Sequence, residues 1–125
     1  MLLEHFHVAP EDEVRVMPDA LDRTVTDIFL KMGMSASDAE LASEVLVSAD
    51  VRGVDTHGVS NMLRRYVEMF NDKFVNPTPE LKILRETPST ANIDADEELG
   101  LVVGAKCMDM AIEKARNTGM GMVTM

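Results

Sequence analysis

The sequence predicts a mixed α/β protein in which a three-helix module precedes the start of an α/β sheet domain. Apolar residues recur at helical spacing in three segments before residue 72, and a proline-containing segment, Asn76–Pro79, then interrupts the pattern. Beyond it, two short strand-like segments joined across Thr87–Ser89 precede one long amphipathic segment. We therefore expect a disordered acidic leader over 1–16, a helical module over 17–75 and the beginning of an α/β domain, truncated, over 76–125.

The first two predicted helices have clear start and stop signals. Pro18 suits a first helical position, and Gly33 suits the left-handed position after a helix end. Ser35 with Asp38 resembles a capping box at the start of the second helix, which should end near Gly53. The apolar positions expected to face inward are Leu21, Val25, Ile28, Phe29 and Met32 in the first helix, and Ala39, Ala42, Val45, Leu46 and Ala49 in the second.

The third helix should follow the link Val54–Gly58, with Asp55 or Thr56 as its N-cap. Its apolar stripe is Val59, Met62, Leu63, Tyr66, Val67 and Phe70. This helix completes the predicted helical module.

The second half predicts a β-hairpin, a long helix and a further strand. Strands over 81–86 and 90–95 should pair antiparallel, and a helix over 100–118 should end at Gly119. Its inward residues are expected to be Leu101, Met108, Ala111, Ile112 and Ala115. A last strand beginning at Met120 predicts that more sheet should follow.

Charge and composition exclude several classes of protein. The formal net charge of −10 disfavours nucleic-acid and anionic-membrane binding, because both need clustered lysine and arginine. The single cysteine, Cys107, excludes an intrachain disulfide, and no apolar run approaches the ~20 residues that span a bilayer. His5 and His7 lack the further ligands that a metal site needs, so no metal site is predicted. We expect a cytoplasmic protein.

The densest polar cluster is Arg52–Gly58, followed by Arg64, Arg65 and Tyr66. A histidine between small residues in a loop can donate or accept a proton near neutral pH, and arginine binds carboxylates through its planar fork. These residue types suit a small anionic substrate such as a 2-oxo or 2-hydroxy acid. The alternative is that His57 completes a helix cap and that the arginines only balance neighbouring acids.

Several sequence blocks resemble the type-2 malate/L-lactate dehydrogenase family. They are Ala49–Val59, Asn76–Pro79, Arg85–Ala91, Gly100–Gly104 and Ala111–Gly121, and they occur in the order found in that family. The resemblance implies hydride transfer between NAD or NADP and a small 2-hydroxy or 2-oxo acid, a homodimer, and a nicotinamide-binding fold that is not of the Rossmann type.

The same resemblance gives roles to particular residues. It implies that His57 is the histidine at the substrate site and that Tyr66 also faces substrate, with Arg64 or Arg65 binding the carboxylate. The family often has arginine where Asn61 stands. No residue is assigned to cofactor binding, because the family's nicotinamide contacts and its further histidine follow the strand that begins at Met120.

The chain is thus expected to be the N-terminal part of such a dehydrogenase and to be inactive alone. The alternative is a catalytically inactive truncated product or a small helical interaction module, since unpaired strand edges and apolar helix faces promote association.

Overall fold

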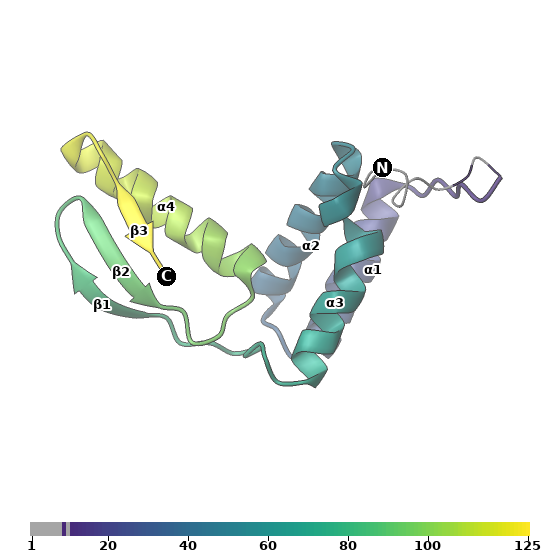
Figure 1. Cartoon of the computed structure of the whole chain (residues 1–125), viewed down its shortest axis with the longest axis horizontal. Helices are drawn as coiled ribbons and strands as arrows, with labels where there is room; N and C mark the ends of the chain where they lie inside the picture. The colour runs from purple at the N-terminus through teal and green to yellow at the C-terminus, as the bar shows by residue number, and fades with distance from the viewer. Residues whose placement is uncertain (1–8, 10) are drawn as a thin grey trace. The chain divides into compact units, whose positions relative to one another are not determined.

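The computed structural model describes residues 9 and 11–125 and confirms the mixed α/β class (Figure 1). In chain order the elements are α1 (Pro18–Lys31), α2 (Ala36–Val51), the 3-10 helix η2 (Asp55–His57), α3 (Val59–Asn71), β1 (Lys82–Glu86), β2 (Thr90–Asp94), α4 (Gly100–Thr118) and β3 (Met122–Thr124). The chain divides into two compact units, Met1–Met69 and Phe70–Met125. None of the described helices is long and apolar enough to cross a membrane.

The predicted leader falls partly outside the described residues, as do His5 and His7, since residues 1–8 and 10 are not described. Residues 11–17 contain neither helix nor strand, and their side chains are exposed. The first helix follows directly at Pro18.

The local signals at the ends of α1 and α2 are confirmed. Pro18 is the first residue of α1, and Gly33 has a φ of 97° two residues after its end. Ser35 Oγ accepts a hydrogen bond from the Asp38 amide at 3.2 Å and donates one to Asp38 Oδ2 at 2.9 Å. The helix starts and stops therefore follow from short-range chemistry.

α1 and α2 pack against each other through small and apolar side chains. The hydroxyl of the buried Ser43 lies 2.8 Å from the carbonyl oxygen of Asp22 and 2.6 Å from its Oδ1, so this polar group has acceptors on α1. Val45, predicted to face inward, is 37% exposed, because Ala42, Ser43 and Leu46 form the buried face of α2 instead. The small side chains of that face allow the two helices to approach closely.

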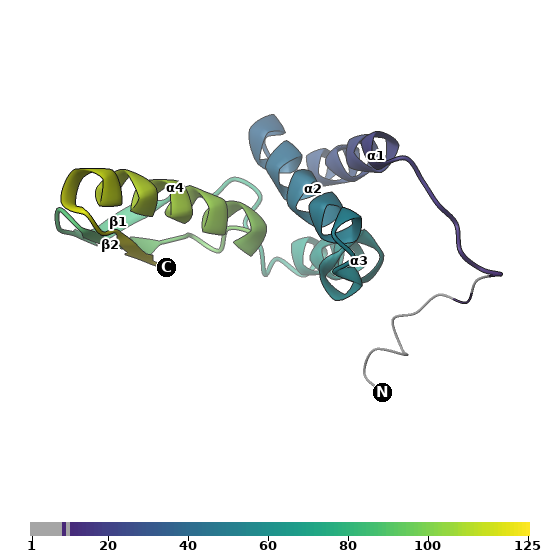
Figure 2. The ribbon, with the colours of Figure 1, turned by 90° about the horizontal axis from the view of Figure 1, so that it is seen from above.

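In the second unit, a three-stranded sheet in the order β1-β2-β3 has α4 along one face (Figures 1 and 2). β1 and β2 pair antiparallel, as predicted, with Lys82 opposite Asp94 and Glu86 opposite Ala91; β2 and β3 pair in parallel. Ile93, Val103 and Cys107 form a buried cluster between helix and sheet. Burial, and secondly the charge of Glu98, raise the pKa of the Cys107 thiol.

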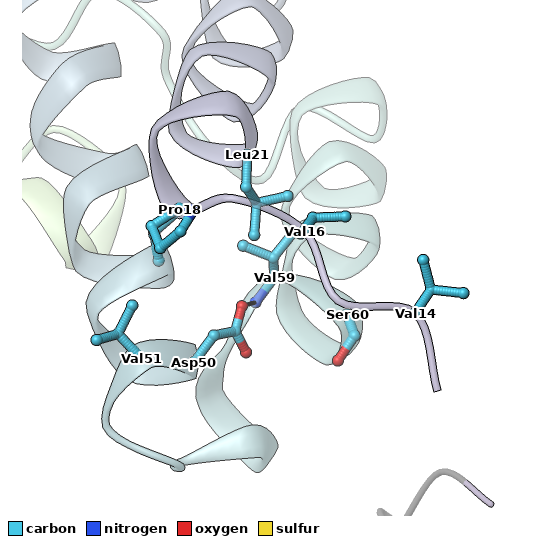
Figure 3. Close-up of a pocket in the computed structure, with 9 residues that line it drawn as sticks. Val14, Val16, Pro18, Leu21, Asp50, Val51, Val59 and Ser60 are labelled. Carbon is cyan, nitrogen blue, oxygen red and sulfur yellow. Dashed lines mark hydrogen bonds between the residues drawn. The ribbon is translucent and has the colours of Figure 1, made fainter. Parts of the chain in front are cut away.

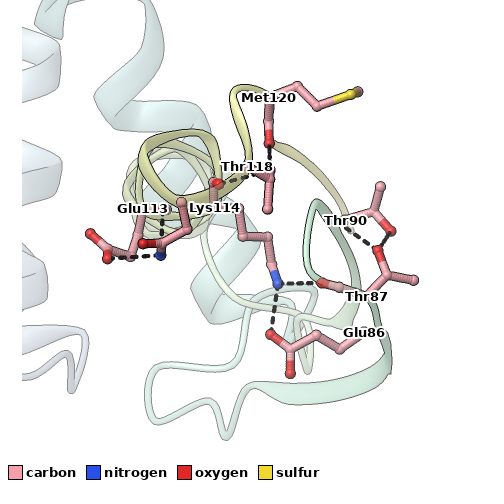
Figure 4. Close-up of polar contacts among 8 residues, drawn as sticks. Glu86, Thr87, Thr90, Glu113, Lys114, Thr118 and Met120 are labelled. Carbon is pink, nitrogen blue, oxygen red and sulfur yellow. Dashed lines mark hydrogen bonds and ion pairs between the residues drawn. The ribbon is translucent and has the colours of Figure 1, made fainter.

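The buried face of α4 differs from the predicted one. Met108 is 60% exposed and Ile112 is 43% exposed. Lys114 is buried instead: its Nζ donates to Glu86 Oε1 at 2.8 Å and to the Thr87 carbonyl at 2.9 Å (Figure 4). A lysine can occupy an apolar face when its stem packs there and its ammonium group finds acceptors, and a hydropathy pattern does not detect this.

Candidate functional site

The candidate site begins where α2 ends. Gly53 has a φ of 71°, its amide donates to the Asp50 carbonyl at 3.0 Å, and the Val54 amide donates to the Ala49 carbonyl at 2.8 Å. This pair of hydrogen bonds is a Schellman motif, which requires a residue in the left-handed region and therefore favours glycine. The chain reverses sharply here and leads into η2.

η2 presents His57 to solvent. The His57 amide donates to the Val54 carbonyl at 2.9 Å, and Asn61 Nδ2 donates to the Asp55 carbonyl at 2.6 Å, so the backbone of η2 is bound from both of its neighbouring segments. Thr56 Oγ1 lies 2.7 Å from His57 Nδ1. Within the described residues Nε2 has no hydrogen-bond partner, so this nitrogen is available to a ligand.

The N-terminus of α3 is bound by a residue that the sequence did not suggest. We predicted Asp55 or Thr56 as the cap, but α3 begins later, at Val59, because Asp55–His57 form η2. The Val59 amide donates to Asp50 Oδ2 at 2.9 Å (Figure 3). Asp50 belongs to α2, so sequence rules that search only the residues next to a helix start would miss it.

The three predicted substrate residues of α3 point in different directions. Successive residues of a helix are rotated by about 100°, so Arg64 and Tyr66 are rotated by about 200° and lie on nearly opposite sides. Arg65 lies between them. A small molecule at one side of α3 therefore does not reach both Arg64 and Tyr66.

Their surroundings also differ. Arg64 Nε is 3.0 Å from Glu68 Oε1, an i,i+4 pair on the exposed surface. Arg65 is exposed and has no ion pair within the described part of the chain. Tyr66 is half-buried, and this burial raises the pKa of its hydroxyl above the ordinary 10.0. Among the described contacts, no hydrogen bond or ion pair joins any two of the four predicted site residues.

A pocket of about 470 Å³ lies beside this loop (Figure 3). Apolar side chains form most of its wall, and Asp50 and Ser60 add polar groups to it. Its lining residues are Val14, Val16, Pro18, Leu21, Val47, Asp50, Val51, Val59 and Ser60. None of the predicted site residues lines it, so the pocket and the exposed face of His57 are separate features of the same unit.

Two kinds of ligand group can be checked among the described residues: metal-binding side chains and the start of α4. No group of three or more histidine, cysteine, aspartate or glutamate side chains is placed to hold a metal in the described part of the chain. The N-terminus of α4 directly follows Asp96, Glu97 and Glu98, whose negative charge opposes a phosphate there.

Comparison with known proteins gives consistent results. The family model described as malate/L-lactate dehydrogenase matches residues 16–125. The chain is 44% identical over 113 residues to malate dehydrogenase of Pyrococcus abyssi, covering 90% of this chain and 31% of that protein. It is 39% identical over 106 residues to L-sulfolactate dehydrogenase of Methanocaldococcus jannaschii, covering 85% of this chain and 30% of that protein.

The fold matches solved structures of similar sequence. The structure of malate dehydrogenase from Pyrococcus horikoshii superposes with a TM-score of 0.88 at 42% identity, covering 94% of this chain and 33% of that one. The chain thus spans about a third of the length of the relatives it matches.

Proposed function

Because the chain belongs to the malate/L-lactate dehydrogenase family, we propose that it supplies substrate-side residues of an oxidoreductase acting on small 2-hydroxy and 2-oxo acids. The observation that carries this proposal is the family match over residues 16–125, together with relatives named as malate and sulfolactate dehydrogenases. The substrates of those relatives are 2-hydroxy acids that carry a second acidic group.

In this proposal His57 binds the substrate oxygen at C2. Its Nδ1 contacts the Thr56 hydroxyl, which orients the ring, and its Nε2 faces solvent without a partner in the described residues. An imidazole nitrogen can donate a hydrogen bond to a 2-oxo group or accept one from a 2-hydroxy group. His57 is therefore the proposed catalytic residue.

We assign the substrate carboxylate to Arg65 in preference to Arg64. The guanidinium of Arg64 already pairs with Glu68, whereas Arg65 has no ion pair among the described residues. A guanidinium without a carboxylate partner is free to form the bidentate contact that a substrate carboxylate accepts. Tyr66 remains a proposed substrate contact through its hydroxyl.

The remaining parts of the proposal come from the family. The cofactor would be NAD or NADP and the assembly a homodimer; the cytoplasmic location is proposed from the sequence composition instead. The dimer has some structural support: Met108, Met122 and Met125 are exposed along an apolar groove beside β3. Exposed apolar surface of this kind favours association. Light scattering on the purified chain tests it, and a monomer at all concentrations would contradict the dimer.

Titration with malate, L-lactate or pyruvate, followed by NMR, tests the substrate site. We expect the imidazole signals of His57 to shift on addition of a 2-hydroxy or 2-oxo acid, and to shift less with succinate, which lacks the C2 oxygen. Arg65→Ala should weaken binding about tenfold, the loss of one charge-assisted contact of ~1.5 kcal/mol. Arg64→Ala is the matched control and should leave binding nearly unchanged. Equal effects of the two variants would contradict the assignment.

Turnover is a separate test. We expect the 125-residue chain alone not to oxidise NADH or NADPH with pyruvate or oxaloacetate, because it spans only about a third of the length of the dehydrogenases that it matches. Measurable oxidation, followed as the loss of nicotinamide absorbance, would overturn this expectation.

A further inference from the structure

Asp50 occupies an electrostatically unfavourable position on its own helix. It lies in the last turn of α2, and that turn contains no basic residue. The carbonyl groups at a helix C-terminus carry partial negative charge, so a carboxylate there is repelled. A carboxylate in this position needs a favourable partner elsewhere.

That partner is the start of the next helix. Asp50 Oδ2 accepts a hydrogen bond from the amide of Val59, the first residue of α3, at 2.9 Å (Figure 3). The first amides of a helix have no partner within the helix and attract negative charge. Asp50 therefore supplies from α2 the acceptor that a capping side chain next to α3 would otherwise supply.

Gly58 provides the space for this contact. Its φ of −86° and ψ of −174° are extended values that any residue adopts, so the backbone conformation does not demand glycine. A Cβ added at Gly58 would instead overlap the Asp50 carboxylate. Glycine at this position is explained by the close approach of that carboxylate to the main chain.

Together with the hydrogen bond between His57 and Val54, the contact of Asp50 binds the chain before and after the His57 side chain. On its N-terminal side the chain is bound through the His57 amide and the Val54 carbonyl, and on its C-terminal side Asp50 contacts Gly58 and Val59. We propose that Asp50 is the positioning residue of the candidate site: it fixes the backbone of Gly58 and Val59 and thereby the direction in which the His57 ring faces solvent. The catalytic meaning of this positioning rests on the function proposed above.

The geometry makes three variants informative. Asp50→Ala removes the acceptor, whereas Asp50→Asn retains a carbonyl oxygen of the same shape for the Val59 amide. Glu44→Ala is the matched control, an exposed carboxylate on the same helix. The readouts are the imidazole signals of His57, identified with the His57→Gln variant, and the hydrogen-exchange rate of the Val59 amide.

We expect Asp50→Ala to shift the His57 imidazole signals and to accelerate exchange of the Val59 amide at least ~10-fold, because that amide loses its acceptor. Asp50→Asn should restore both readouts nearly to the parent values, and Glu44→Ala should change neither. The signals of α1 residues report whether the fold is retained. Unchanged His57 signals in Asp50→Ala, or an Asn variant as disturbed as the Ala variant, would refute the positioning role.

A double variant tests the contact itself. Gly58→Ala alone should displace the loop and shift the His57 signals, since its methyl group overlaps the carboxylate. In the Asp50→Ala background the methyl group has room, so Gly58→Ala should add little. Residues in contact are expected to show such coupling, and strictly additive shifts would contradict the proposal.

Malate titration separates this inference from the proposed function. If His57→Gln leaves malate binding unchanged while Asp50→Ala still moves the His57 signals, the substrate role of His57 is wrong and the positioning stands. If His57→Gln abolishes malate binding while Asp50→Ala changes neither that binding nor the His57 signals, the positioning is wrong and the proposed function stands.

Discussion

Each unit of the chain contains a turn whose backbone is bound by one charged side chain from a helix. In the first unit Asp50 of α2 accepts from the Val59 amide, nine residues along the chain. In the second unit Lys114 of α4 donates to the Thr87 carbonyl, 27 residues earlier (Figure 4). Lys114 also has an ionic partner, Glu86, whereas Asp50 has no ion pair within the described residues.

The two contacts differ in the elements that they connect and in the burial of the charged side chain. The Lys114 side chain is only 10% exposed and connects a helix with a hairpin, so its contact is part of the packing of that unit. Asp50 is half-buried and connects two successive helices through a short loop, so its contact orients the loop. We therefore expect loss of Lys114 to reduce stability most, and loss of Asp50 to affect mainly the candidate site.

The largest effect is expected for Lys114→Ala. It removes a buried stem and leaves the Thr87 carbonyl without its donor, so the free energy of unfolding should fall by about 2–4 kcal/mol. Lys114→Met retains the stem volume and should recover about half of the loss. Urea unfolding followed by circular dichroism measures both. Equal losses would show that the charge alone, and not the packed stem, is what stabilises this contact.

Asp50→Ala should have the second largest effect, a loss of about 1–2 kcal/mol, because it leaves a helix N-terminal amide unpaired. Asp50→Asn should lose less than about 0.5 kcal/mol, since an amide oxygen also accepts this bond. The same urea experiment measures both variants. If Asp50→Ala lowered the free energy of unfolding as much as Lys114→Ala, the Asp50 contact would stabilise the fold as strongly as the Lys114 contact, contrary to this prediction.

Glu86→Gln should have a smaller effect, about 0.5 kcal/mol or less, because the Glu86 side chain is 52% exposed and exposed ion pairs are weak. Lys114 keeps the Thr87 carbonyl and an amide oxygen as acceptors. Thermal unfolding at low and at high salt measures this variant against the parent chain. An effect that is large and independent of salt would show that Glu86 is less solvated than its exposure indicates.

The smallest effect concerns Tyr66, the only tyrosine in a chain without tryptophan. Burial raises the pKa of its hydroxyl in the folded chain, so the folded state keeps this proton where the unfolded chain has begun to lose it. The stabilisation is therefore complete below pH 10 and decreases as pH rises above that value. Absorbance at alkaline pH should give a titration midpoint above that of the urea-unfolded chain. Coincident midpoints would contradict the burial of Tyr66.

Much of the secondary structure could be predicted, because its signals are local. The α4 bounds, Gly100 to Thr118, agree with the prediction, and Gly119 follows with a φ of 84°. The hairpin around residues 87–89 and a strand after Met120 are also confirmed. The roles of His57, Arg64, Arg65 and Tyr66 stay predictions, although the ion pair of Arg64 now favours Arg65 for the carboxylate.

The sequence by itself determined where helices and strands begin and end, since caps, left-handed glycines and prolines act within a few residues. The sequence also contains the blocks that resemble the malate/L-lactate dehydrogenase family. Only the tertiary structure decided which side chains form contacts between those elements. On α4, Lys114 is buried and the predicted Met108 is exposed. At the start of α3, Asp50 binds the first amide, and not the predicted Asp55 or Thr56. Both contacts form because an acceptor or amide from another part of the chain lies within hydrogen-bond distance. The spacing of residues along the sequence does not specify that distance.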